Sequence, residues 1–360
     1  MLRRWPVLLR PIVWIIALLA CPVQSVRQAT RLHRASPELM DRFGNSAFRR
    51  IATLAWLSMR YNLPAEKVVE WYSHPDRSRM DLWWEDLEGV RLLEALNDSR
   101  AMELAIDKQA FALWCERNGF QAVPTLASWS GGDSQSADPV ALPGEVVLKP
   151  ARGSQGGGVS LWQRDGDNWR SGARAITAAD WSAMLVRASP AGHVILAQPR
   201  LHPHADLAAL TAPAATVLRV NSALLKTGGT EIVSAYLSLH PAGSFVASPA
   251  ERTERGIDFA SGETLPSQSV LAPRWTGSES PDGRPIPHWS ELCSLVRKAH
   301  AAFPGSPVLL GWDVAVTDDG PVLIEVNTRV GFGLHQRATG QPACAGRWGI
   351  ILDEWLKAKF

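Results

Sequence analysis

The chain has 360 residues, which is more than one hydrophobic core usually organises, so two or three domains are expected. Apolar residues make up 46% of it and charged residues 20%, a composition that excludes intrinsic disorder. Lysine and arginine number 37 against 35 aspartate and glutamate, and this net charge of +2 excludes a polycationic nucleic-acid binder. The four cysteines have no paired spacing, which argues against a zinc ribbon or a disulfide framework and favours a reducing compartment.

The first 35 residues depart from this charge balance. They hold six arginines and no acidic residue, around an apolar run over 11–20 that is too short to span a bilayer as a helix of about 20 residues. Three interpretations stay open for segment 1–35. It is an exported signal segment, because residues 18–21 resemble a lipoprotein cleavage site, or a basic segment on the inner face of a membrane, or an ordinary buried helix.

Apolar residues then recur at helical spacing and predict a helical N-terminal region over 36–104. The sequence Asn62-Leu63-Pro64 interrupts the pattern and predicts a break between two helices. A further helix is expected from Asp107 to Arg117, and Asn118-Gly119 stops it. The helical spacing is shown by Phe48, Ile51, Leu54, Ala55 and Leu57. The tryptophans of these helix patterns, Trp56, Trp71 and Trp114 among them, are expected mostly in the core.

Beyond residue 120 short apolar strands appear, so the chain is predicted to be helical first and mixed α+β afterwards. Residues 130–144 are expected to form a polar loop, and residues 266–287 a long Pro/Ser/Gly connection. Helices are expected near 177–188 and 289–302. Strands are expected at 123–129, 145–149, 158–162, 193–198, 216–225, 231–239, 309–316 and 322–326.

The segment 309–327 predicts a hairpin with two facing acids. A three-residue loop, Asp318-Asp319-Gly320, would pair Asp313 with Glu325. Carboxylates whose Cβ atoms lie about 5 Å apart repel by roughly 3 kcal/mol, so a compensating cation is expected. Magnesium suits such an all-oxygen site, which Asn327 would complete. The alternative is a solvated hairpin edge with ordinary surface acids.

The same hairpin register makes further expectations. It pairs Ala315 with Leu323 and Thr317 with Pro321. One face of the hairpin would then be apolar, formed by Val314, Val316, Val322 and Ile324.

A second element combines a lysine with a glycine loop. A strand ends in Lys149, the loop runs from Gly153 to Gly158, and another strand returns. Backbone N–H groups of such a loop can approach phosphates closely, while the lysine adds positive charge beside the same oxyanions. It is neither a P-loop nor a dinucleotide-binding turn, and a plain surface glycine loop is the alternative interpretation.

Together these residues resemble the ATP-grasp superfamily over about residues 105–340. The resemblance implies an α+β fold in which two α+β subdomains sandwich ATP, with ATP and Mg²⁺ as ligands. It places the ATP-grasp domain at 105–345, after the helical region and before a C-terminal helix at 346–360. The implied nucleotide-binding residues are Lys108, Lys149, Arg152, Gly153, Ser154, Gly156, Gly157, Gly158, Gln198, Pro199, Arg200 and Leu201, and the implied magnesium ligands are Asp313, Glu325 and Asn327.

Several single residues have two interpretations each. Arg219 shares a strand face with Val217 and Asn221, and its charge requires an anionic partner, either the phosphate in transfer or an internal acid. With Lys149 it is the residue predicted to stabilise charge during catalysis. Asp206, with its neighbouring histidines, either contacts ribose or lies in a solvated loop.

The histidines outside this group have open roles. His288 is expected to cap the helix that follows it rather than to act chemically. His335 and Gln336 follow the metal strand and either orient a substrate or are structural.

A narrower likeness is to the sugar-transfer-associated ATP-grasp group. It rests on segments 198–207, 216–220, 287–289 and 311–336, whereas 241–262 departs from the pattern and leaves the acceptor open. The likeness implies a cytoplasmic ATP-dependent ligase, with segment 1–35 as a candidate contact to the inner membrane face. The enzyme would activate a small carboxylate for capture by an amine or a sugar-linked acceptor in polysaccharide biosynthesis. The alternatives are kinase-like transfer to a sugar hydroxyl and a nucleotide-binding scaffold for glycan-assembly enzymes.

Overall fold

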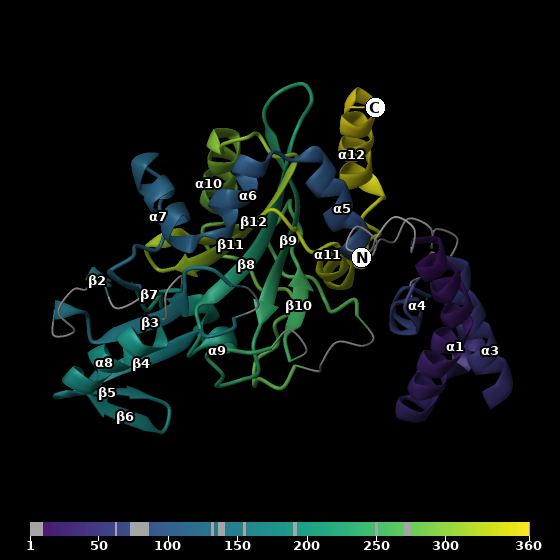
Figure 1. Ribbon diagram of the computed structural model, residues 1–360, viewed down its shortest axis with the longest axis horizontal. Helices are drawn as coiled ribbons and strands as arrows, with labels where there is room; N and C mark the ends of the chain where they lie inside the picture. Colours follow the sequence, from purple (N-terminus) through teal and green to yellow (C-terminus); the bar gives the residue numbers. More distant parts are fainter. Residues whose placement is uncertain are drawn as a thin grey trace. The chain divides into compact units, whose positions relative to one another are not determined.

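The computed structural model describes residues 10–61, 63–72, 86–130, 133–135, 141–153, 156–189, 193–248, 251–269 and 275–359. The chain divides into two compact units (Figure 1). The helical unit comprises Met1–Glu85 with Ser269–Leu271, and the α+β unit comprises Asp86–Gln268 with Ala272–Phe360. Within the described residues, none of the helices is both long enough and apolar enough to cross a membrane.

The helical unit packs around a small core that includes Leu54, Val68 and Trp71. The break predicted before Pro64 is confirmed, because one helix ends at Tyr61 and the next begins beyond that proline. The elements are α1 (Arg10–Ala35), α2 (Pro37–Met40), the 3₁₀ turn η3 (Asp41–Phe43), α3 (Ala47–Tyr61) and α4 (Ala65–Tyr72).

Two apolar side chains of α3 do not join this core. Phe48 is 81% exposed and Trp56 is 57% exposed, so the prediction that Trp56 is a core residue is wrong. The helix packs against its neighbours through one face only, and Leu54, Ala55 and Leu57 are buried on that face. Apolar residues on the opposite face therefore remain at the surface.

The α+β unit begins with three helices, α5 (Asp86–Leu96), α6 (Ser99–Ile106) and α7 (Lys108–Arg117). Its first sheet has seven antiparallel strands in the order β2-β1-β7-β3-β4-β5-β6. Helix α8 (Ala178–Ala188) contacts strands of this sheet (Figure 1). The strands are β1 (Ala127–Ser130), β2 (Asp133–Gln135), β3 (Glu145–Pro150), β4 (Ser160–Asp165), β5 (Asn168–Ser171), β6 (Arg174–Thr177) and β7 (Val194–Pro199).

A tryptophan cluster fills the space between α8 and this sheet. Trp181 of α8 stacks on Trp169 at a centroid distance of 4.7 Å and meets Trp129 and Trp162 edge-on. Burial of four such rings commits this face of the sheet to packing. The opposite face is left to carry polar side chains.

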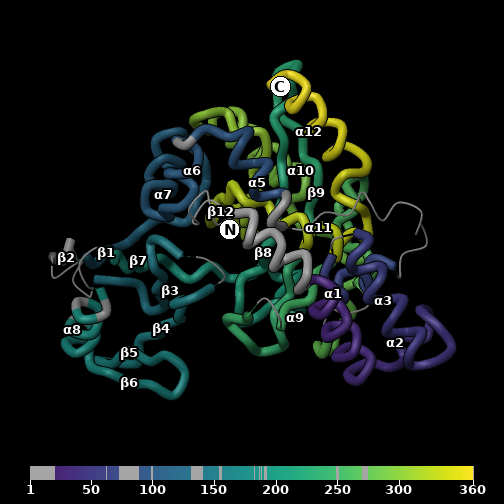
Figure 2. The backbone as a smooth tube through the Cα atoms, turned by 45° about the vertical axis from the view of Figure 1, so that its right-hand side comes forward, coloured from purple at the N-terminus to yellow at the C-terminus, as the bar shows by residue number. Residues whose placement is uncertain are grey.

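The second sheet has five antiparallel strands in the order β10-β9-β8-β11-β12. Figure 2 shows α6, α7 and α10 (Trp289–Ala302) gathered beside it, and their apolar side chains join its main core. The strands are β8 (Thr216–Leu224), β9 (Thr230–Leu239), β10 (Thr253–Gly256), β11 (Leu309–Thr317) and β12 (Gly320–Asn327). The remaining elements are η6 (Ala205–Leu207), α9 (Ala208–Thr211), α11 (Phe332–Thr339) and α12 (Gly346–Lys359).

The predicted α+β fold, preceded by helices, is confirmed, but several short strands were not expected. Strands β2, β5, β6 and β10 have three or four residues each, too few to show an apolar alternation. The strand expected from Val123 begins only at Ala127. Val123 instead donates its N–H to the carbonyl of Leu323, at 3.0 Å, which ties the chain ahead of β1 to the second sheet.

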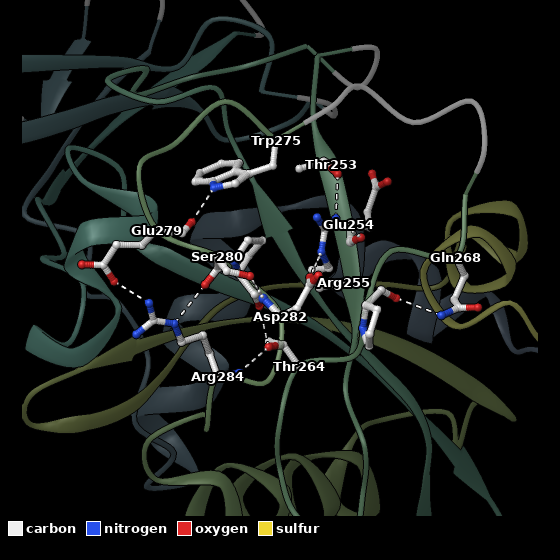
Figure 3. Close-up of polar contacts among 12 residues, drawn as sticks. Thr253, Glu254, Arg255, Thr264, Gln268, Trp275, Glu279, Ser280, Asp282 and Arg284 are labelled. Carbon is white, nitrogen blue, oxygen red and sulfur yellow. Dashed lines mark hydrogen bonds and ion pairs between the residues drawn. The ribbon is translucent and has the colours of Figure 1, made fainter.

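The described parts of the connection over 266–287 carry their own polar network (Figure 3). Arg255 of β10 donates Nε–H to Asp282 at 2.6 Å, and Thr264 donates to the carbonyl of Pro281 at 2.6 Å. Arg284 pairs with Glu279, also at 2.6 Å. The composition of 266–287 is typical of a flexible connection, but these contacts attach its described part to β10, the edge strand of the sheet.

A buried polar chain joins β8 and β11 to α10. Trp312 donates its indole N–H to Ser222 Oγ at 2.8 Å, and Ser222 Oγ lies 2.6 Å from His300 Nδ1. His300 Nε2 lies 2.9 Å from the carbonyl of Pro307, which can only accept, so Nε2 carries the proton and Nδ1 accepts from the serine. Burial lowers the pKa of His300 to about 4, and the imidazole is neutral in the folded protein.

This arrangement predicts a pH dependence of stability. Between pH 6.5 and about 4 the unfolded chain binds a proton at His300 that the folded chain does not, so the free energy of unfolding falls as the pH falls through this window. The contribution is on the order of 3 kcal/mol. The measurement is urea unfolding at several pH values. As the pH is lowered from 6.5 to 4, the free energy of unfolding should decrease less in His300→Gln than in the wild type, although the variant is less stable at pH 7. His193→Gln, at an exposed histidine, is the control, and parallel profiles for His300→Gln and the wild type would contradict the assignment.

Candidate functional site

The hairpin of β11 and β12 carries the predicted acids, but its register differs from the prediction. Thr317 pairs with Gly320, so the loop has two residues instead of three, and Ala315 pairs with Val322 instead of Leu323. Between Val314 and Asp313 the register shifts by one residue, because Ile324 has no partner and forms a β-bulge. The bulge restores the predicted pairing of Asp313 with Glu325.

The same shift changes which apolar residues share a face. Val314 and Val316 belong to the main core of the sheet, whereas Val322 and Ile324 join a separate small cluster with Ala315. The prediction of one common apolar face is therefore wrong. A bulge exchanges the two faces of a strand, and single-residue alternation cannot reveal it.

Charged side chains lie in one row across the sheet. Glu325 on β12 is opposite Asp313 on β11, and Asp313 is opposite Arg219 on β8. Arg219 makes a bidentate pair with Asp313, in which Nε donates to Oδ1 at 2.5 Å and Nη2 donates to Oδ2 at 3.2 Å. Of the two interpretations of Arg219, the structure shows the internal ion pair, which the strand register imposes.

The two acids differ in how they are compensated. Burial and the facing Glu325 together raise the pKa of Asp313 to about 6, against the opposing effect of Arg219. Burial disfavours the charged form of Arg219, but Asp313 outweighs it, so the pKa of the guanidinium group lies above its usual value. Within the sheet Arg219 pairs with Asp313 alone, so Glu325 depends on cations from outside the hairpin.

Two lysines reach the same place from outside the hairpin. Lys108, at the first residue of α7, donates Nζ–H to the carbonyl of Gly153 at 2.8 Å and lies 3.4 Å from Glu325 Oε2. Lys149 of β3 is only 6% exposed. Burial lowers its pKa to about 8, with a contribution from Lys108, while Glu325 and Asp313 act in the opposite direction. The charged row of the second sheet therefore meets Lys149 of the first sheet and Lys108 of α7.

The donor set fits a magnesium ion. Asp313 and Glu325 supply carboxylate oxygens, and Asn327 donates Nδ2–H to Glu325 Oε1 at 3.4 Å, which leaves its own oxygen for a ligand. Among the described residues no group of three or more His, Cys, Asp or Glu side chains could hold a metal ion. An ion at this row would rely on two carboxylates, one amide and the oxygens of a phosphate or of water, the set that magnesium accepts.

The glycine loop has the backbone that its composition predicts. Gly156 and Gly158 have φ values of +73° and +76°, and Gly157 lies between them in the turn. A Cβ atom on Gly158 would come within 2.9 Å of Pro150 Cγ, so this position excludes a side chain. Ser154, predicted to bind phosphate, lies outside the described residues.

Arg152 has a different neighbour from the one predicted. Its Nε lies 3.2 Å from Asp107 Oδ2, and its side chain is 70% exposed. Asp107 also accepts from the backbone N–H groups of Gln109 and Ala110, so it caps α7. Arg152 therefore holds the start of the helix that presents Lys108.

The predicted adenine hinge follows β7. Gln198 is 3% exposed, and its Nε2 is buried without a hydrogen-bond partner, although Val147 lies opposite it on β3. Pro199 ends the strand. Arg200 is anchored through its two terminal nitrogens to Glu145 and to the carbonyl of Pro213, at 2.6 and 2.9 Å, while its Nε is buried without a partner.

The residues that follow the hinge divide into two groups. Leu201 packs against the small cluster that contains Ala315 and Val322. Asp206 lies in η6 with its side chain 76% exposed, 3.8 Å from the ring of His204, and no described contact brings it to the charged row.

His335 and Gln336 are packed inside the protein. His335 stacks on Trp348 with ring centroids 4.8 Å apart, and Gln336 accepts a hydrogen bond from the backbone of Ala343 at 3.0 Å. Both contacts attach α11 to the chain that follows it. His288 precedes α10, where its ring lies 3.2 Å from Glu291 without making a side-chain cap bond.

Sequence reasoning missed one residue beside the glycine loop, Arg252. A Cβ atom on Gly156 would lie 3.5 Å from its Nη2, and its Nε and Nη2 both donate to the carbonyl of Ala247. Among the described residues no acidic side chain pairs with it. No sequence signal could have found it, because segment 241–262 matches no motif and the contact joins two distant loops.

Two further residues extend the row on β8 and β9. Tyr236 is opposite Arg219, is 2% exposed, and places its hydroxyl 3.9 Å from where a Cβ of Gly331 would lie. Asn221 is fully buried, donates to Ser234, and has no partner for its Oδ1. Alternation along β8 places Asn221 on the face of Arg219, as the sequence predicted, whereas Tyr236 lies on the neighbouring strand and no local signal indicates it.

Comparisons with known proteins agree with this architecture. Residues 88–345 match the model of the family described as sugar-transfer associated ATP-grasp. No curated protein matched the sequence.

Among solved structures, the L-amino acid ligase from Bacillus licheniformis is similar at 13% identity and a TM-score of 0.43, over 72% of this chain and 49% of that one. This chain thus spans about half the length of that ligase. The D-alanine–D-alanine ligase from Bacillus anthracis complexed with ATP is similar at 15% identity and a TM-score of 0.43, over 74% of each chain. The biotin carboxylase from Campylobacter jejuni reaches 17% identity and 0.43, over 72% of this chain and 47% of that one. These similarities concern the fold alone.

The row predicts that Gly311 cannot be replaced. A Cβ atom there would lie 2.9 Å from Asn221 Oδ1 and 3.3 Å from Arg219 Cδ and Nη1, so Gly311→Ala must displace Asn221 and crowd the arginine that pairs with Asp313. We expect a loss of about 1–3 kcal/mol in the free energy of unfolding, measured with urea. Gly144→Ala is the matched control, because its Cβ meets no atom within 4 Å. A Gly311→Ala variant as stable as that control would contradict the packing described.

Proposed function

Because the chain belongs to the sugar-transfer associated ATP-grasp family, we propose that it is an ATP-dependent ligase that activates a carboxylate as an acyl phosphate. The observation that carries the proposal is the meeting of Asp313 and Glu325 with three cationic side chains. Arg219, Lys108 and Lys149 outnumber the two acids, so the site has an excess of positive charge. Such a site is complementary to a triphosphate that brings its own divalent ion.

The nucleotide would be held at both of its ends. Lys108, Lys149 and the backbone N–H groups of 153–158 would contact the phosphates, since glycines at this loop allow close approach. At the other end Gln198 has an unpartnered amide in a buried position, and rotation of that amide presents either its oxygen or its nitrogen to adenine. The backbone of Arg200 and Leu201 would read the ring edge.

Asp313, Glu325 and Asn327 would hold magnesium. When bound, the ion neutralises the phosphate charge that develops during transfer. The chain's own residues position the substrates and stabilise charge: Lys149 stays largely protonated at neutral pH despite its pKa of about 8, and Arg219 fixes Asp313 in place.

The proposed reaction has two steps. A carboxylate oxygen of the substrate forms a bond to the γ-phosphorus as the bond to the ADP oxygen breaks. An amine, or another nucleophile, then attacks the acyl carbon, and inorganic phosphate leaves. Lys149 and Arg219 are the side chains proposed to stabilise charge in the first step, because both are buried beside the acids.

Arg252 is proposed to contact the terminal phosphate. It lies against Gly156 of the glycine loop and has no acidic partner among the described residues. A guanidinium group that is anchored only to a carbonyl can bind phosphate oxygens without first breaking an ion pair.

The finer parts of the proposal concern partners and place. We place the nucleotide-binding domain at 105–345, with helical residues 36–104 before it and the helix at 346–360 after it. The acceptor would be an amine or a sugar-linked group in polysaccharide or cell-surface glycan synthesis, which the family description supports. The protein would act in the cytoplasm, with residues 1–35 in contact with the inner face of the membrane.

The activity is tested in two stages. Calorimetry with the non-hydrolysable analogue AMP-PNP should show binding that is at least tenfold tighter with magnesium than without it. Glu325→Gln should abolish this difference, because it removes a carboxylate charge from the metal site. Asp319→Asn, in the exposed turn of the same hairpin, is the control. Asp313→Asn is less informative, since it leaves Arg219 buried without its partner.

In the second stage, ATP and a panel of amino acids and uronic acids are incubated with hydroxylamine. A hydroxamate identifies the acyl phosphate, and its formation should cease in Glu325→Gln. A stable phosphoester would indicate a kinase instead. Tight nucleotide binding without any product on the panel would favour a scaffold.

The role of Arg252 predicts selectivity for the third phosphate. Arg252→Gln should weaken AMP-PNP binding about tenfold and leave ADP binding unchanged, since one charged hydrogen bond is lost only with the longer ligand. Arg297→Gln, at an exposed arginine of α10, is the control. Equal losses for both nucleotides would contradict the assignment while leaving the proposed activity intact.

A further inference from the structure

Helix α3 presents an apolar stripe to solvent. Phe48 is 81% exposed, Trp56 57% and Met59 37%, and Ala52 between them is exposed as well. At 3.6 residues per turn these positions fall within about a quarter of the helix circumference. The stripe is therefore a continuous surface on one side of α3, opposite the face that packs in the core.

Exposed apolar residues elsewhere include the neighbouring valines Val23 and Val26 of α1 and several single residues. Leu113 lies on α7, Phe259 follows β10, and Ile350 lies on α12. Single exposed apolar residues are normal on a protein surface, whereas aromatic residues grouped on one helix face indicate a binding surface.

The charge around the stripe has one sign. Arg49 and Arg60 are exposed and follow Phe48 and Met59 directly, and α3 contains no acidic residue. Residues 10–61 hold eight arginines and no lysine against two acidic residues, although the whole chain has a net charge of only +2. Among the described residues no acid pairs with Arg27, Arg31, Arg34, Arg49 or Arg60.

We propose that the stripe Phe48, Ala52, Trp56 and Met59 binds the surface of a lipid bilayer that contains anionic phospholipids. The aromatic rings and the thioether would enter the interface between headgroups and acyl chains, where tryptophan is favoured. Arg49 and Arg60 would lie at the level of the lipid phosphates. Charge complementarity selects this partner, because an apolar stripe on a helix whose only charged residues are arginines matches a negatively charged apolar surface.

The proposal does not depend on the proposed activity. It rests on the exposed side chains of α3 and on the arginines of α1 and α3 that no described acid pairs. A protein that turned over no ATP could still bind lipid through this stripe. Failure of one proposal therefore leaves the other standing.

The test is flotation of the full chain with two kinds of vesicle. One kind contains phosphatidylcholine alone, and in the other about one third of the lipid is phosphatidylglycerol. Binding should occur on the anionic vesicles and weaken as salt is raised. Phe48→Ser with Trp56→Ser should lower the binding constant at least tenfold, because two aromatic side chains no longer leave water. Arg49→Gln with Arg60→Gln should lower it several-fold on anionic vesicles only.

Matched controls remove the same kinds of group elsewhere. Leu113→Ser with Ile350→Ser removes exposed apolar side chains, and Arg297→Gln with Lys298→Gln removes exposed charges. Both pairs should leave vesicle binding unchanged. Circular dichroism should show unaltered helix content in all variants, and Trp56→Phe should retain binding while losing part of the blue shift in tryptophan emission on anionic vesicles.

Three outcomes would overturn the proposal. The first is equal binding to neutral and anionic vesicles, or none to either. The second is wild-type binding by the Phe48→Ser, Trp56→Ser pair. The third is a Phe48→Ser, Trp56→Ser variant that dissociates an oligomer or has a lower unfolding temperature but binds vesicles as the wild type does. That result would assign the stripe to a protein–protein interface.

Discussion

The pairing of two buried acids across adjacent strands constrains the rest of the site. Asp313 and Glu325 face each other because the backbone register of β11 and β12 places them so. The two carboxylates therefore cannot move apart into solvent. Arg219 compensates one charge from β8, and the lysines approach from α7 and β3. Removing one partner of such a buried pair costs about 3–5 kcal/mol, so each of these elements must be in place for the others to be stable.

The strand geometry around the acids serves this arrangement. The bulge at Ile324 turns Glu325 to the side of Asp313, and the missing side chain at Gly311 leaves room for Arg219 and Asn221. Behind the row, the buried chain from Trp312 through Ser222 to His300 fixes the same two strands from the opposite face. The Arg219–Asp313 pair on one face and the hydrogen bonds to the neutral His300 on the other face therefore both stabilise the observed register of β8 and β11.

Local pattern predicted much of this fold, and its failures have physical causes. Valine-rich strands such as β3, β8 and β11 were found because their apolar runs are long, whereas β5 and β6 were missed because they bury few side chains. The facing acids were predicted correctly from a wrong register, since two errors of one residue, the loop length and the bulge, cancelled. Arg252 and the approach of Lys108 to Glu325 could not be predicted, because they depend on how loops distant in sequence are brought together.

Trp56 illustrates a second limit of pattern reading. Helix α3 is apolar on two faces, and periodicity alone does not say which of them meets the core. The structure buries the face with Leu54 and Leu57, and the face left outside is the one that carries the aromatic rings between arginines. An apolar face that stays in water raises the free energy of the protein, and a partner that covers the face removes this cost. The positive charge of residues 10–61, unmatched in the rest of the chain, limits that cover to a negatively charged surface.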